Sequence, residues 1–266
     1  IPHGFNIGAA GQLPKCHNLL HSHRTAEVFF VLSGRWKFFW GRYGKAGEVI
    51  LEKGDIFNIP TGIFRGFENI GKDYGMIMAI LGGDDAGGGV IWAPEVLKEA
   101  ENHGLVLSEK GKIYDTKIGQ KIPSNEYLMQ PLTENELKKF PEYSSAEVVP
   151  NYVARYLDLY SLSQNNPVIV IGENGKIFDK PGFEVEFITD QSSMNSKKSY
   201  EKDVVFIPVE GYWMLSLENH NLILNPGDTF SLPKNNEYTL NPTKPGMATL
   251  YKVIPTNDKP GPTTRK

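Results

Sequence analysis

The sequence has almost no cysteine, no long apolar run and no cluster of charges of one sign. Cys16 is the only cysteine among 266 residues, so a disulfide cannot form within the chain, and a reducing, cytoplasmic setting is the simplest fit. We expect Cys16 to be a small buried residue rather than a nucleophile. No apolar stretch is long enough to span a bilayer, so no membrane partner is expected. The net charge of -3 and the lack of a Lys/Arg block give no reason to expect a nucleic-acid partner.

Short runs of β-branched and aromatic residues dominate two parts of the chain, at about residues 13–81 and 167–254. Turns rich in glycine, asparagine and aspartate separate these runs, which is typical of a sandwich or a jelly-roll barrel. The residues between the two blocks predict short helices instead. One is expected over Pro94 to Asn102, and a capping box at Thr133 to Glu136 begins another. The pattern therefore predicts an all-β protein with a partly helical connector.

Three side chains that commonly bind metals lie close together near the start of the chain. His21, His23 and Glu27 occupy odd positions, and side chains alternate between the faces of a strand, so all three are expected on one side. The same parity applies to His17, which is a candidate substitute ligand. Two imidazoles and one carboxylate suit a divalent transition metal, Fe(II) in particular, with Mn, Ni, Cu and Zn as alternatives.

The spacing of these residues resembles the first sequence motif of the cupin superfamily. That motif is a His-x-His pair, a Glu after three or four residues, and a Gly after six more. His21, His23, Glu27 and Gly34 match it without a gap. The resemblance implies a jelly-roll β-barrel with a metal held inside it.

The second cupin motif departs from the family pattern at one ligand. It runs from a Gly through Pro-x-Gly to a His and an Asn, and its positions here are Gly54, Pro60, Gly62, Arg65 and Asn69. Arginine stays protonated and cannot bind a metal. Either Arg65 anchors an anionic group of a substrate beside a three-ligand metal, or it forms a buried ion pair with Glu27 in a site that has lost its metal. We favour the first alternative, because a lost site has little physical reason to keep both histidines and the glutamate.

The second β-rich block repeats the first but lacks the metal-binding residues. Gly227 to Pro233 is similar to Gly54 to Pro60, and Val204 to Gly211 is similar to Glu27 to Gly34. The residues that align with His21, His23, Glu27 and Arg65 are Lys198, Tyr200, Val204 and Tyr238. The resemblance thus implies a bicupin, with two cupin-type jelly-roll barrels in one chain. The expected parts are a metal-bearing domain at 1–90, whose first strands we expect upstream of Ile1, a connector at 91–160, a scaffold domain at 161–256 and a polar tail at 257–266.

Cupins include dioxygenases, decarboxylases, isomerases, lyases and binding proteins, so the fold does not decide the function. By resemblance to quercetinase-like and gentisate-like dioxygenases, a three-ligand site with open positions favours a metal-dependent oxygenase acting on a small organic acid or phenolic compound. One alternative is a non-oxidative metalloenzyme, in which Tyr43 or Glu27 moves a proton. Another is a ligand-binding or structural bicupin. A monomer and a homodimer are equally consistent with the sequence.

Two further residues are candidates for substrate contact. These are Trp36 and Asn58, although an aromatic run such as Trp36 to Trp40 more often packs in a core. The glycine-rich residues 82–89 lack the Lys-Ser/Thr pair of a phosphate-binding loop. We expect them to form a flexible loop near the mouth of the barrel.

Overall fold

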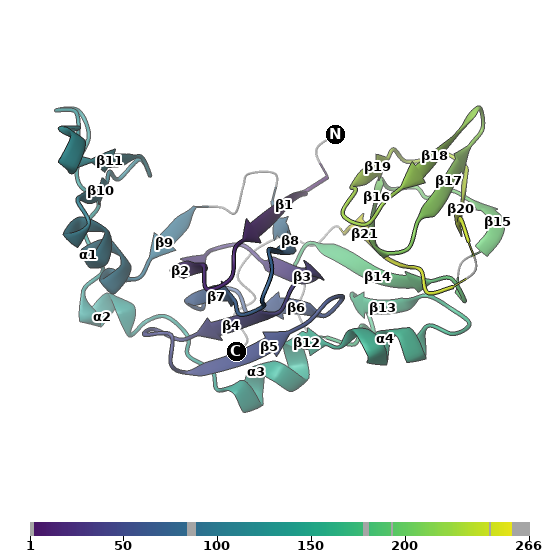
Figure 1. Cartoon of the computed structure of the whole chain (residues 1–266), viewed down its shortest axis with the longest axis horizontal. Helices are drawn as coiled ribbons and strands as arrows, with labels where there is room; N and C mark the ends of the chain where they lie inside the picture. Colours follow the sequence, from purple (N-terminus) through teal and green to yellow (C-terminus); the bar gives the residue numbers. More distant parts are fainter. Residues whose placement is uncertain (1–2, 84–88, 178–180, 193, 245, 257–266) are drawn as a thin grey trace.

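The computed structural model describes residues 3–83, 89–177, 181–192, 194–244 and 246–256, and it is built mainly of antiparallel strands. The strands form two barrels that lie side by side, with short helices below them and an arm at one end (Figure 1). The predicted all-β fold of two jelly-roll barrels is confirmed. Residues 84–88 of the glycine-rich segment and the tail at 257–266 lie outside the described residues.

Two five-stranded sheets form the first barrel. Their strands are β1 (Phe5–Gln12), β2 (His17–His23), β3 (Glu27–Ser33), β4 (Trp36–Trp40), β5 (Gly47–Leu51), β6 (Ile56–Ile59), β7 (Arg65–Asn69), β8 (Gly75–Gly82), β9 (Val90–Trp92) and β12 (Val153–Ala154). One sheet has the order β1-β8-β3-β6-β12, and the other has the order β5-β4-β7-β2-β9. β12 comes from the predicted connector, so part of that segment extends a sheet of the first barrel.

The second barrel repeats the strand order of the first. Its strands are β13 (Val168–Ile171), β14 (Phe183–Thr189), β15 (Met194–Lys198), β16 (Val204–Glu210), β17 (Trp213–Leu217), β18 (His220–Leu224), β19 (Phe230–Leu232), β20 (Tyr238–Pro242) and β21 (Thr249–Pro255). The order β1-β8-β3-β6 recurs as β14-β21-β16-β19, and β5-β4-β7-β2 recurs as β18-β17-β20-β15. The register recurs as well, because His21 lies opposite Arg65 and Lys198 lies opposite Tyr238. The internal repeat expected from the sequence is therefore present in three dimensions.

The connector contains more helix than the sequence predicted. Its remaining elements are α1 (Pro94–Asn102), β10 (Leu105–Leu107), β11 (Ile113–Asp115), the 3-10 turn η1 (Thr116–Ile118), α2 (Glu134–Leu137), α3 (Ser145–Tyr152) and α4 (Tyr156–Leu162). α1 and the capping box at the start of α2 are confirmed. α3 was missed, although Ser144 and Glu147 form a second capping box at its start. None of the helices among the described residues is long and apolar enough to cross a membrane.

The largest apolar core lies between the barrels. Alternation along β3 divides its side chains, so that Val28 and Phe30 face the second barrel while Phe29 and Val31 fill the first. The ring of Phe30 lies 5.0 Å from that of Tyr251, centroid to centroid. This shared core means that the two barrels stabilise one another.

Asp55 of the second motif ties the connector to the first barrel. Its carboxylate accepts hydrogen bonds from the Glu52 backbone, from Arg155 Nη1 at 2.7 Å and from the Tyr156 backbone N–H at 2.9 Å. The residue is only 6% exposed, so these partners replace water around its charge.

Replacing Asp55 with alanine is expected to lower the free energy of unfolding by roughly 2–4 kcal/mol, because three donors lose a charged partner. Urea unfolding followed by circular dichroism measures the change. Asp73→Ala, at an exposed position, is the matched control and should change the free energy by less than about 0.5 kcal/mol. Equal stability of the two variants would contradict this role.

Candidate metal centre

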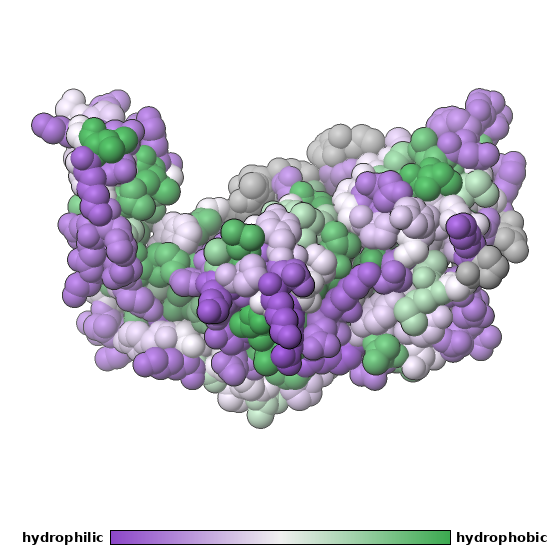
Figure 2. All heavy atoms as spheres, in the orientation of Figure 1, coloured by the Kyte–Doolittle hydropathy of each residue, from purple (hydrophilic) through white to green (hydrophobic). Residues whose placement is uncertain are grey.

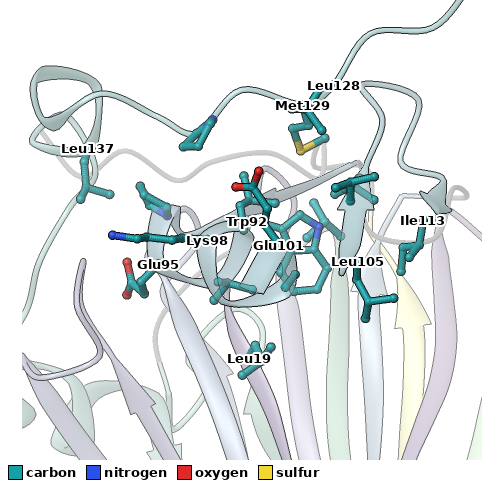
Figure 3. Close-up of a pocket in the computed structure, with 18 of the residues that line it drawn as sticks. Leu19, Trp92, Glu95, Lys98, Glu101, Leu105, Ile113, Leu128, Met129 and Leu137 are labelled. Atoms are coloured by element: carbon teal, nitrogen blue, oxygen red, sulfur yellow. The ribbon is translucent and has the colours of Figure 1, made fainter. Parts of the chain in front are cut away.

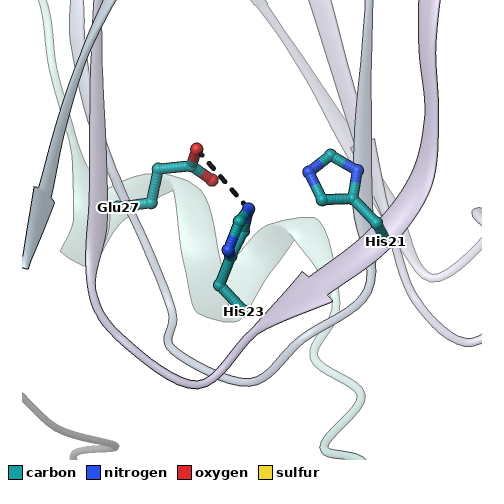
Figure 4. Close-up of side chains that lie close together, drawn as sticks. All are labelled: His21, His23 and Glu27. Atoms are coloured by element: carbon teal, nitrogen blue, oxygen red, sulfur yellow. Dashed lines mark ion pairs between the residues drawn. The ribbon is translucent and has the colours of Figure 1, made fainter. Parts of the chain in front are cut away.

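Two neighbouring strands bring the predicted metal ligands together. β2 ends with His21-Ser22-His23, and after a short turn β3 begins with Glu27 in the facing sheet. The three side chains are buried, with 6–7% of each residue exposed. Figure 4 shows His23 and Glu27 pointing toward one another, with the His21 ring beside them.

The distances suit the binding of one metal ion by all three residues after small side-chain movements. One ligand atom from each of the three residues can be chosen so that all lie within 4.8 Å of one another. His23 Nε2 is 3.9 Å from Glu27 Oε1, and the two imidazole centroids are 5.1 Å apart. Two ligands with bonds of about 2.1 Å lie at most about 4.2 Å apart, so modest rotations bring the three groups onto one ion. Among the described residues, this is the one group of three such side chains that close together.

The backbone sets the orientation and charge of His21. Its Nδ1 is 2.7 Å from the carbonyl oxygen of Leu19, so Nδ1 carries the proton and donates, which leaves the lone pair on Nε2. Burial, followed by the positive charge of Arg65, lowers the pKa of His21 to about 4. The imidazole is therefore neutral near pH 7, as a metal ligand must be.

Arg65 forms a buried ion pair with Glu27. Arg65 Nε donates to Glu27 Oε2 at 3.0 Å, Nη2 donates to the same oxygen, and Nη1 donates to the His21 carbonyl at 3.1 Å. Burial by itself would raise the pKa of Glu27, but the adjacent charge of Arg65 and its hydrogen bonds hold the pKa below its usual value. Because Glu27 and the His21 carbonyl accept hydrogen bonds from the guanidinium, the structure gives no support for the expected contact between Arg65 and an anionic substrate. The alternative contact, with Glu27, is the one formed.

The ion pair still leaves one carboxylate oxygen of Glu27 toward the histidines. Arg65 contacts Oε2, whereas Oε1 is the oxygen that faces His23. A neutral imidazole at His21, the ring of His23 and Oε1 make a donor set that suits a divalent transition metal. The residues therefore fit such an ion, with Glu27 as a one-oxygen ligand.

Two other candidates lie away from this group. His17 is exposed and lies opposite Glu68 in the β2–β7 strand pair. The register of this pair shifts between Asn18 and His21, which interrupts the alternation of side chains that would have placed His17 beside His21. Tyr43 is 53% exposed, and its hydroxyl donates to Glu134 at 2.9 Å. The expectation that Cys16 is buried is wrong, since the residue is exposed.

The two expected substrate contacts are placed in packed interiors. Trp36 is fully buried, donates from Nε1 to the Ser33 carbonyl, and lies opposite Asn69, at the other end of β7 from Arg65. Asn58 lies opposite Val28, whose side chain faces the second barrel, so the pleat directs Asn58 away from Glu27. Neither residue lies where a substrate beside the histidines would be.

Sequence reasoning missed Trp92, which contacts the site. β9 pairs with β2, placing Trp92 opposite His21 with the two rings 5.4 Å apart. The short apolar run Val90 to Trp92, just before Pro94, was the available signal for a strand. Its partner could not be chosen, because about seventy residues separate it from β2.

The corresponding place in the second barrel holds a different network. Val204, which aligns with Glu27, packs in an apolar cluster. Tyr200 and Tyr238 stack with centroids 6.2 Å apart, and Lys252 Nζ donates to the Tyr200 hydroxyl at 2.6 Å. These side chains do not form a metal-binding set.

Comparison with known proteins gives the same fold. Residues 13–81 match a family model described as a cupin domain, and no curated protein matches the chain. The chain is similar to a salicylate 1,2-dioxygenase from Pseudaminobacter salicylatoxidans, with a TM-score of 0.55 and 14% identity over 96% of this chain and 71% of that one. A variant of that enzyme was solved in complex with gentisate, with 13% identity, a TM-score of 0.57 and coverage of 96% and 69%.

Two further solved structures are similar to the chain over nearly its whole length. A variant of the Bacillus subtilis oxalate decarboxylase gives a TM-score of 0.57 and 13% identity over 97% of this chain and 70% of that one. AerE from Microcystis aeruginosa gives a TM-score of 0.51 and 11% identity over 96% of this chain and 88% of that one. At these identities the likeness concerns the fold, and the chain has the fold of two cupin-type β-barrels joined by a partly helical connector.

Proposed function

We propose that the chain is a metal-dependent cupin enzyme whose ion is bound by His21, His23 and Glu27 in the first barrel. The observation that carries the proposal is the grouping of these three buried side chains, with ligand atoms within 4.8 Å of one another. Two histidines and one carboxylate are the ligand set of many non-haem Fe(II) sites, so iron is the first choice. Mn, Ni, Cu and Zn are the alternatives.

Arg65 and the Leu19 carbonyl act as positioning groups in this proposal. The guanidinium holds Glu27 Oε2 and so presents Oε1 to the ion, while the carbonyl fixes the His21 tautomer. Because the positive charge of Arg65 balances the negative charge of Glu27, the site as a whole keeps the positive charge of the bound cation. An anionic substrate, such as a carboxylate or a phenolate, is therefore attracted to the site.

For the reaction we propose the oxygenation of a small organic acid or phenolic compound. Bound Fe(II) would supply redox chemistry with O2. The similarity to a salicylate dioxygenase, including a variant solved with gentisate, supports this choice, and the similarity to an oxalate decarboxylase supports a non-oxidative rival. In that rival the metal acts as a Lewis acid, and Tyr43 is an unsuitable base because its hydroxyl is bonded to Glu134 at the surface.

Anaerobic loading with Fe(II), followed by elemental analysis, is expected to give about one equivalent of metal per chain. His23→Ala should retain less than about a tenth of an equivalent, because one of three ligands is lost. His17→Ala is the matched control and should retain the metal, since His17 is exposed. Less than about a tenth of an equivalent in the unmodified protein would overturn the proposal.

Oxygen uptake distinguishes the two reactions. The iron-loaded protein is expected to consume O2 in the presence of hydroxybenzoate-type or other small acidic substrates. Turnover at the same rate without O2 would exclude the oxygenase and favour the non-oxidative enzyme.

The second candidate function is a ligand-binding or structural bicupin without a metal. The contact between Arg65 and Glu27 favours it, because the guanidinium already compensates the buried carboxylate. The loading experiment decides between the two, since this candidate binds no ion even in the unmodified protein.

A further inference from the structure

The connector forms an arm that stands away from the first barrel. The arm, residues 94–131, contains α1 and the β10–β11 hairpin and rises at one end of the molecule (Figure 1). Its base is fixed to the barrel, where Val96 packs with Leu20 and Phe64. Hydrophobic side chains gather on the side of the arm that faces the barrel (Figure 2).

A groove of about 1150 Å³ lies between the arm and the barrel (Figure 3). Apolar side chains line most of it, among them Leu19, Trp92, Leu105, Ile113, Leu128 and Met129. Several are strongly exposed in the single chain, with Ile113 at 62%, Leu128 at 41% and Leu19 at 39%. Burying one such side chain is worth about 1.5–3 kcal/mol, so an open apolar surface of this extent indicates a docking site.

The shape of the groove favours a protein partner over a small ligand. Small-molecule sites usually measure about 300–1000 Å³ and enclose most of the ligand's surface. This groove lies just above that range, and residues on both of its walls remain exposed to water, so it would not enclose a small ligand. A folded segment of another chain fills such a space better.

The charges of the arm point to a second copy of the same chain. The charged side chains that line the groove are three carboxylates, Glu95, Glu101 and Glu134, and two lysines, Lys45 and Lys98, so the groove carries a net negative charge. The hairpin and η1, at residues 105–121, carry four lysines and two carboxylates. Ile118 of η1 is 71% exposed and gives this basic segment an apolar tip. Each copy thus presents both a basic, apolar-tipped segment and an acidic-edged apolar groove.

We infer that two copies exchange these arms, the hairpin of each entering the groove of the other around a two-fold axis. Such an interface uses one patch on both subunits, so one surface must carry both complementary parts, as this arm does. The inference goes beyond the proposed function and does not depend on a bound metal.

Sedimentation velocity over a range of concentrations tests the inference. The unmodified chain is expected to be a dimer, and Ile113→Arg should weaken dimerisation at least about tenfold, because a charge enters the apolar groove. Ile223→Arg is the matched control, since Ile223 is 51% exposed on the second barrel, and it should leave the dimer intact. A chain that stays monomeric up to about 100 µM, or a dimer unaffected by Ile113→Arg, would overturn the inference.

Charge reversal tests the reciprocal exchange itself. One variant carries Lys112→Glu and Lys117→Glu in the hairpin segment, and the other carries Glu95→Lys and Glu101→Lys on the groove. Each variant alone is expected to be monomeric, because like charges meet at both contacts of its dimer. An equimolar mixture should form dimers again, since both contacts then join opposite charges. Dimers of either variant alone, as stable as those of the unmodified chain, would contradict this arrangement.

Trp92 provides an independent readout in the folded protein. Trp36, Trp40 and Trp213 are fully buried, whereas Trp92 is partly exposed in the groove, so it dominates quenching by acrylamide. Quenching should fall as the concentration rises through the dimerisation range, and Ile113→Arg should abolish this dependence. If the dye ANS binds a monomeric chain and Ile113→Arg prevents that binding, the groove is a small-molecule site and the inference is wrong.

Discussion

Replacing Arg65 with methionine is expected to lower the free energy of unfolding by about 3–5 kcal/mol, because it leaves the carboxylate of Glu27 buried without its partner. Glu27 is only 7% exposed, and Arg65 supplies two of the hydrogen bonds to its Oε2. Urea unfolding in the presence of a chelator measures the loss. The same variant should recover part of its stability when a divalent metal is added, since the ion then compensates Glu27.

The double variant Glu27→Leu with Arg65→Met is the control for this prediction. Removing both charges from a buried pair costs far less than removing one, so the double variant should be more stable than Arg65→Met. Metal should not stabilise the double variant, because a ligand has gone. If the free energy of unfolding of Arg65→Met lies within about 1 kcal/mol of that of the unmodified protein, Arg65 does not stabilise the buried carboxylate as proposed.

Local patterns in the sequence predicted the parts of the site that depend on a single strand. His21 and His23 share a face because they are two residues apart on β2, and Glu27 follows after one turn. The internal repeat also followed from the sequence, because the same turn residues recur before equivalent strands. These features depend on neighbours along the chain, and the alternation of a strand is enough to place them.

The parts that depend on pairing between distant strands could not be predicted. The register break within β2 places His17 away from the other candidate ligands. The pairing of β6 with β3 directs Asn58 toward the other barrel. Arg65 could satisfy either a substrate or Glu27, and the sequence contains no information on which partner lies nearer. The contact of β9 with β2, which brings Trp92 to His21, joins segments that only the folded chain brings together.

Lys252 is a buried cation of the second barrel, and its ammonium lies beside Tyr200, the residue that aligns with the proposed ligand His23. Tyr251 and Val253 face the core between the barrels, so Lys252 points into the second barrel, where it is 1% exposed. Its Nζ lies 2.5 Å from Glu186 Oε2 and 2.6 Å from the hydroxyl of Tyr200, which aligns with His23. The ammonium therefore has one partner on β14, Glu186, and one just after the end of β15, Tyr200.

Lys252→Met is expected to lower the free energy of unfolding by about 3–5 kcal/mol, because Glu186 and the Tyr200 hydroxyl lose their partner inside the barrel. Lys252→Met with Glu186→Gln should be the more stable variant, and Lys234→Met, at an exposed position, should change stability by less than about 0.5 kcal/mol. Added divalent metal should not rescue Lys252→Met, because within the described part of the chain no set of metal ligands surrounds Glu186, whereas it should rescue Arg65→Met. Equal rescue of both variants would mean that metal acts on stability at some place other than His21, His23 and Glu27. Rescue of Arg65→Met alone would therefore place the stabilising metal in the first barrel, where the proposal puts it, and not beside Lys252 in the second.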